Sequence, residues 1–111
     1  MNLSVEEIDG GVTKVTLDGR LDIEGAAAVD LRMNVVAGSA QRLLVDLAGV
    51  TFLGSMGLRS IVVPAQAVKR RGGKTVLFAP VPLVEEVLNT ANISAVLPVR
   101  HDLESALAEL R

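Results

Sequence analysis

The chain contains no cysteine among its 111 residues, so disulfide bonds, thiolate nucleophiles and cysteine-based metal sites are excluded. It has a single histidine, His101, and its acidic residues show no recognisable ligand spacing. We therefore expect a fold that needs no metal and no cofactor. The acidic start of the chain, the missing disulfides and the lack of any apolar run near the ~18 residues of a membrane span predict a cytoplasmic protein with no membrane span.

Aromatic residues are almost absent, since the chain has two phenylalanines and neither tryptophan nor tyrosine. Without aromatic side chains to stack on bases, and with a net charge of −2, the chain is not expected to bind nucleic acid directly. The basic residues Lys69, Arg70, Arg71 and Lys74 lie near the end of a predicted helix, where we expect a solvated face. Half of all residues are hydrophobic, which predicts one compact domain over residues 1–111 with an aliphatic core.

Apolar periodicity predicts both strands and helices. Alternation on either side of a turn at residues 9–11 predicts a hairpin over residues 3–17, and continuous apolar runs predict buried strands at residues 43–47 and 74–79. Residues 95–99 are expected to form a further short strand. Helical spacing predicts four helices, and the expected buried face of the first comprises Ala27, Ala28, Leu31, Val35 and Val36.

The later helices have clearer limits. The second begins at Ser55, has its apolar stripe from Leu58 to Val68, ends at the glycines 72–73 and is expected to bend, not break, at Pro64. The third covers residues 82–92, and the fourth runs to Leu110 behind the N-cap residue Asp102. This order predicts an α/β fold with a mixed sheet of four to five strands and about four helices. The runs 43–47 and 75–79 should be parallel, central neighbours, because a helix connects them.

Ser55 stands between Gly54 and Gly57 in the stretch TFLGSMGLRS, where a strand pattern changes to a helix pattern. A hydrolase nucleophile elbow requires glycine two residues before the serine, and Leu53 occupies that place. His101 would be the only histidine base, and its sequence neighbours give no reason to place it near Ser55. We therefore expect no enzymatic activity, and a small serine-nucleophile enzyme remains the least favoured alternative.

A second catalytic pattern also fails. Gly73, Lys74 and Thr75 resemble the end of a phosphate-binding P-loop, but Val68 stands where the first glycine belongs and a strand follows.

Two roles for Ser55 remain compatible with its surroundings. As an N-cap, its hydroxyl would accept a hydrogen bond from the first turn of the second helix, and its loss would cost about 0.5–2 kcal/mol. The free amides and positive dipole of a helix N-terminus would also stabilise a phosphate on the same hydroxyl. Gly54 and Gly57 have no side chains and would let the backbone of another protein come close.

The chain resembles the STAS domain family over nearly its whole length, and within that family the single-domain bacterial anti-sigma-factor antagonists. Residues 46–58, DLAGVTFLGSMGL, are similar to the family signature Asp-Leu-Ser-x-Val-x-Phe-x-Asp-Ser-Ser/Thr-Gly-Leu. Three further segments match in register: residues 19–22 (GRLD), 71–73 (RGG) and 102–107 (DLESAL). Gly54 replaces the usual aspartate, Met56 replaces the second hydroxyl residue, and Arg59 stands where glycine is common.

The resemblance implies a switch in which an anti-sigma factor serine kinase phosphorylates Ser55 and a serine phosphatase reverses the reaction. The unphosphorylated form would bind the kinase and release a sigma factor. Arg59 could pair with a phosphate on Ser55 one turn back. The expected partner-binding residues are Asp22, Gly54, Met56, Gly57 and Arg59. The main alternative is a STAS subunit of another assembly, such as a lipid ABC transporter, that never receives phosphate.

Overall fold

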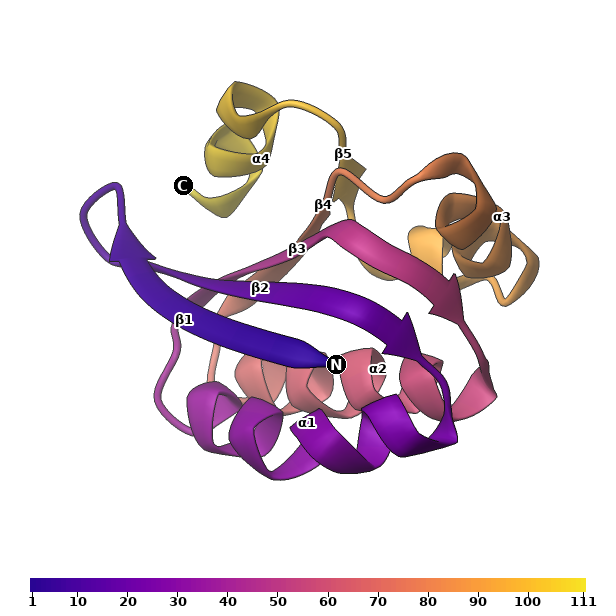
Figure 1. Ribbon diagram of the computed structural model, residues 1–111. Helices are drawn as coiled ribbons and strands as arrows, with labels where there is room; N and C mark the ends of the chain where they lie inside the picture. The colour runs from indigo at the N-terminus through magenta and orange to yellow at the C-terminus, as the bar shows by residue number, and fades with distance from the viewer.

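A five-stranded sheet in the order β1-β2-β3-β4-β5 is the framework of the computed structural model, which describes residues 1–111 (Figure 1). The first pair is antiparallel and the other three are parallel, so the sheet is mixed as predicted. The strands are β1 (Asn2–Ile8), β2 (Val12–Leu21), β3 (Arg42–Leu53), β4 (Lys74–Phe78) and β5 (Val99–Arg100). The two apolar runs are parallel neighbours, with Leu43 opposite Thr75 and Val45 opposite Leu77, which confirms that prediction.

Helices cover both faces of the sheet (Figure 1). They are α1 (Ile23–Ala37), α2 (Ser55–Arg70), α3 (Pro82–Thr90) and α4 (Leu103–Leu110). Because side chains alternate along a strand, Leu43 and Val45 join the larger core with α1, α2 and α3, whereas Leu44 joins Ala106 and Leu110 of α4 on the other face. None of the four α-helices combines the length and the apolar character that a membrane span requires.

The second helix follows its prediction closely. Ile61, Ala65 and Val68 are buried at helical spacing, and α2 continues unbroken through Pro64 to Arg70. Ser60 donates a hydrogen bond to Asp30 of α1, so a polar contact as well as apolar packing holds the two helices together.

The predicted buried face of α1 is wrong. The buried residues are Gly25, Ala26, Val29, Met33 and Ala37, whereas Leu31 and Val35 are 77% and 67% exposed. The helix carries apolar residues on more than one side, so periodicity alone could not choose between them. Gly25 decides the rotation, because any Cβ there would collide with the backbone carbonyl of Arg20.

The predicted strand over residues 95–99 is also wrong in extent. Residues Ile93–Ala95 form a 3₁₀ helix, and only Val99 and Arg100 pair with β4. Asn92 adopts a left-handed conformation at φ 62°, which turns the chain at the end of α3. Val96 is 69% exposed, so no packing holds it against the sheet.

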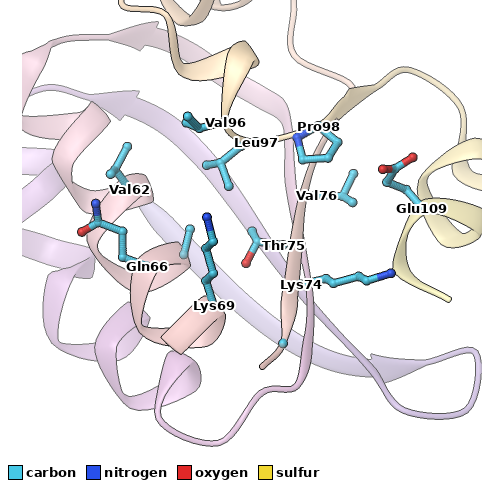
Figure 2. Close-up of a pocket in the computed structure, with 12 residues that line it drawn as sticks. Val62, Gln66, Lys69, Lys74, Thr75, Val76, Val96, Leu97, Pro98 and Glu109 are labelled. Atoms are coloured by element: carbon cyan, nitrogen blue, oxygen red, sulfur yellow. The ribbon is translucent and has the colours of Figure 1, made fainter. Parts of the chain in front are cut away.

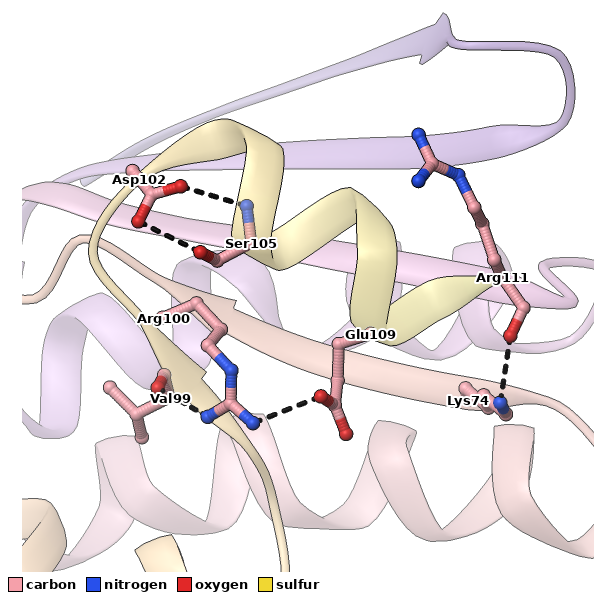
Figure 3. A network of polar contacts seen from close by, with 7 residues as sticks. All are labelled: Lys74, Val99, Arg100, Asp102, Ser105, Glu109 and Arg111. Atoms are coloured by element: carbon pink, nitrogen blue, oxygen red, sulfur yellow. Dashed lines mark hydrogen bonds and ion pairs between the residues drawn. The ribbon is translucent and has the colours of Figure 1, made fainter.

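The basic residues at the end of α2 have different roles, which corrects the expected solvated face. Arg71 donates hydrogen bonds to the carbonyl oxygens of Ala37 and Ala40 and so satisfies the end of α1. Lys74 donates to the main-chain oxygen of Arg111 at 3.0 Å and helps to hold the end of α4 (Figure 3). Lys69 and Arg70 are exposed.

Candidate functional site

Two helix N-termini lie side by side at one end of the sheet (Figure 1). Strands β2 and β3 are in register at their last residues, Leu21 and Leu53, and each strand leads directly into a helix. The Gly54 N–H donates to the Leu21 carbonyl at 3.1 Å, which ties the two turns together. The structure thus brings Asp22 next to the segment that contains Gly54 and Ser55.

Ser55 is the first residue of α2 and is exposed. The N-cap is Gly54, which has the extended dihedral angles φ −102° and ψ −178° and accepts the first helical hydrogen bond from Leu58 N–H at 2.9 Å. The prediction that Ser55 caps the helix is therefore wrong by one position. No side chain accepts the N–H groups of the first turn, so they remain open beside the Ser55 hydroxyl.

Asp22 closes the corresponding turn of α1. Its Oδ1 accepts a hydrogen bond from Gly25 N–H at 2.8 Å. That bond holds the pKa of the Asp22 carboxyl below its ordinary value, against an opposing effect of desolvation and with further help from Arg20. Asp22 is thus a charged N-cap of α1. It directly follows Leu21, whose carbonyl accepts the hydrogen bond from Gly54 N–H.

Arg20 is a site residue that sequence reasoning missed. Its guanidinium lies 4.4 Å from the centroid of the Phe52 ring, and its Nε is 3.4 Å from Asp22 Oδ2. Arg20 faces Phe52 only because the β2–β3 register shifts between Gly19 and Arg20. Periodicity could not reveal that shift.

The remaining predicted contact residues divide by exposure. Met56 and Arg59 are exposed on the first turns of α2, and Arg59 is one turn after Ser55. Gly57 is buried, and a Cβ there would lie 2.8 Å from Leu21 Cγ. The space at Gly57 is therefore filled by Leu21 of the same chain, which corrects the expectation that a partner's backbone would approach it.

The site presents an exposed serine hydroxyl at a helix N-terminus that has no side-chain cap. His101 is bonded to Glu85 of α3 at 2.7 Å, and it forms no hydrogen bond with Ser55. No group of three or more histidine, aspartate or glutamate side chains comes together in a way that could hold a metal ion. The arrangement offers hydrogen-bond donors and positive potential to an anion placed at Ser55.

Comparison with known proteins agrees with this geometry. A family model described as the STAS domain matches residues 3–106. BtrV of Bordetella bronchiseptica, named as a candidate anti-sigma factor antagonist, is 28% identical over 118 residues, which cover 100% of this chain and 96% of BtrV. The anti-sigma F factor antagonist of Paenibacillus polymyxa is 26% identical, over 99% of this chain and 97% of its own. The crystal structure of an anti-sigma factor antagonist from Mycobacterium paratuberculosis superposes with a TM-score of 0.87 at 28% identity, over 99% of this chain and 93% of that one.

Proposed function

Because the chain belongs to the STAS domain family, we propose that it is an anti-sigma factor antagonist, a binding module that is switched by reversible phosphorylation of Ser55. The observation that carries this proposal is the exposed Ser55 hydroxyl on an α2 N-terminus with no side-chain cap. The names of the relatives that match nearly the whole chain support the same assignment.

The proposed docking surface comprises the exposed or half-buried residues around the two helix N-termini: Arg20, Asp22, Ser55, Met56 and Arg59. Met56, which is 41% exposed, supplies an adaptable apolar contact, and the charged residues around it orient the partner. Gly54 leaves room next to Ser55 for a kinase to reach the hydroxyl.

Phosphorylation would change this surface by electrostatics. A phosphoserine adds about −1.5 to −2 charges at neutral pH and three acceptor oxygens. The open amides of the α2 first turn would hold that group, and Arg59 one turn later is positioned to pair with it. Placed next to the Asp22 carboxylate and in the middle of the docking surface, the same charge would weaken binding of the anti-sigma factor kinase. A serine phosphatase would restore the binding form.

The test begins with native partners that co-purify with the chain. After incubation with the co-purified kinase and ATP, intact-mass analysis should show the wild type gaining one phosphate and Ser55→Ala gaining none. Ser39→Ala is the matched control, because Ser39 is also exposed but lies beyond the far end of α1, and this variant should gain phosphate like the wild type.

Three outcomes would contradict the proposal. Equal phosphate incorporation by Ser55→Ala would remove Ser55 as the acceptor, and recovery of a membrane ATPase complex without any kinase would favour the transporter-subunit alternative. Selective labelling of Ser55 by a fluorophosphonate would indicate a nucleophilic enzyme instead.

A further inference from the structure

A cavity of about 420 Å³ lies at the C-terminal half of α2, away from Ser55 (Figure 2). From Ser55 to Lys69 the helix rises by about 20 Å. The cavity is bounded by α2, by the start of β4 and by the segment before β5. Its volume lies within the roughly 300–1,000 Å³ of small-molecule pockets.

The cavity exists because β5 is short. Leu77 and Ala79 donate their N–H groups to the carbonyls of Pro98 and Arg100 at 2.9 and 2.8 Å. The N–H groups of alternate strand residues point to the same side, so the Thr75 N–H also points to the β5 side of β4. Pairing with β5 begins only at Leu77, two residues later. Val96, which would have to continue the strand, instead lies on the cavity wall.

Thr75, in the cavity wall, has a side-chain hydroxyl without a hydrogen-bond partner. It is only 7% exposed, and its Oγ1 is the one buried side-chain polar atom of the chain that has no hydrogen-bond partner. A buried hydroxyl without a partner is unfavourable, and its presence calls for a group that satisfies it. Thr75 thus lines the cavity and carries two donors, the buried hydroxyl without a partner and the N–H on the β5 side of β4.

The charges around the cavity favour one negative group. Lys69 extends from α2 toward Leu97 and forms none of the ion pairs of the chain (Figure 2). Glu109 also lines the cavity, but Arg100 binds it at 2.9 Å (Figure 3). The remaining wall is largely apolar, with Val62 and Ala65 on α2 and Leu97 and Pro98 opposite.

We propose that this cavity binds a small organic carboxylate with an apolar body. The two carboxylate oxygens accept from the Thr75 hydroxyl and the Thr75 N–H, the Lys69 ammonium balances the charge, and the aliphatic part packs against Val62, Ala65 and Leu97. A monoanion fits better than a phosphate dianion, because Lys74, the other cation on the wall, already donates to the Arg111 main-chain oxygen at 3.0 Å, and because the Glu109 carboxylate also lies on the wall.

The experiment is an NMR titration of the ¹⁵N-labelled full chain with hexanoate, with 1-hexanol and acetate as controls for the body and the head group. Hexanoate should shift the amides of Thr75 and Leu97 in a saturable manner and leave that of Ser55 unchanged, and neither control should saturate. Lys69→Gln and Thr75→Val should each weaken hexanoate binding about tenfold or more. Arg70→Gln, the adjacent cation outside the cavity, should bind like the wild type.

The melting temperature of Thr75→Val is a second readout, which distinguishes loss of hexanoate binding from damage to the fold. Valine has the shape of threonine without the unpaired hydroxyl, so this variant should melt at or above the temperature of the free wild type while losing hexanoate binding. No saturable shift with hexanoate, equal saturation with hexanol, or unchanged binding by Lys69→Gln would each overturn the proposal. None of these results depends on whether Ser55 is phosphorylated.

Discussion

The N-termini of α1 and α2 have the same backbone arrangement but different N-cap residues. Each helix follows one of two adjacent parallel strands, and each has a glycine as its third residue, Gly25 in α1 and Gly57 in α2. Both glycines lie against backbone, since a Cβ would meet Arg20 at the first and Leu21 at the second. The N-cap is Asp22 in α1 and Gly54 in α2, and only Asp22 places an acceptor on the first turn.

This difference shows that the glycine contacts are required by the fold, whereas the choice of N-cap residue is not. The close glycine contacts position both helices, so they belong to the fold. The cap of α1 shows that a carboxylate can be accommodated in this type of turn and stabilise it. The absence of such a group in α2 is therefore not imposed by the fold, and it leaves the first-turn N–H groups without a side-chain acceptor, as the proposed phosphate on Ser55 requires.

The largest expected effect comes from filling the contact shared by the two turns. Gly57→Ala places a methyl group against the Leu21 backbone and should lower the free energy of unfolding by about 1–3 kcal/mol. Urea denaturation would measure it, with Gly54→Ala as the control, because a Cβ at Gly54 meets only the edge of the Phe52 ring at 3.2 Å. Equal loss in both variants would show that close backbone approach does not define the α2 turn.

Removing the cap of α1 should have the next largest effect. Asp22→Ala deletes the acceptor for Gly25 N–H and should cost about 0.5–2 kcal/mol in urea denaturation. Glu24→Gln is the control, since Glu24 is an exposed acid of the same first turn that forms no capping hydrogen bond. If both substitutions cost the same, general attraction to the helix dipole would explain the effect and the capping bond would not.

The same cap predicts a dependence on pH. Because the folded pKa of Asp22 is lowered, its stabilising contribution is complete above the unfolded pKa, about 3.9, and is lost as the pH falls through the folded value. Asparagine also caps helices but does not titrate there. Stability measured from pH 7 to pH 2 should therefore decrease less for Asp22→Asn than for the wild type, and parallel curves would exclude Asp22 from the acid response. Asp102, whose pKa is lowered mainly by Ser105, keeps part of that response in both proteins.

Giving α2 an aspartate N-cap like that of α1 should have a smaller effect on stability. Gly54→Asp supplies an acceptor at an extended backbone position that aspartate can adopt, and it should raise stability over the wild type by only a few tenths of a kcal/mol. Gly54→Ala adds the same Cβ without an acceptor and should be less stable than Gly54→Asp. If the two variants unfold together, the α2 turn cannot use a side-chain cap and the analogy with α1 fails.

Sequence patterns predicted the parts of this fold in which one arrangement satisfies the apolar residues. The runs at 43–47 and 75–79 could only be central strands, and α2 has one clear stripe that includes Ile61 and Val68. For α1 several faces were apolar enough, and the choice depended on the close contact of Gly25 with the Arg20 carbonyl at the end of β2. For β5 the apolar residues were present, but Asn92 turns the chain in a left-handed conformation and Val96 is exposed outside the sheet.

The candidate site was predictable in position but not in detail. The change from strand to helix around Ser55, together with the family resemblance, placed the site at one end of the sheet. Which residue caps α2 depended on a one-residue difference between Gly54 and Ser55, below the accuracy with which helix ends can be read from sequence. The Arg20–Phe52 contact and the Ser60–Asp30 bond join distant segments, so they appear only in three dimensions.

The smallest expected effect on stability is at Ser55 itself. Since Gly54 is the N-cap, Ser55→Ala removes an exposed hydroxyl that caps nothing, and the free energy of unfolding should stay within about 0.5 kcal/mol of the wild type. Asp102→Ala is the matched control, because Asp102 does cap α4 by accepting from Ser105 N–H at 2.8 Å, and its loss should cost about 0.5–2 kcal/mol. A loss of 1 kcal/mol or more in Ser55→Ala would mean that the hydroxyl caps α2 in solution. With stability unchanged, any loss of phosphate incorporation in this variant follows from the missing hydroxyl and not from a damaged fold.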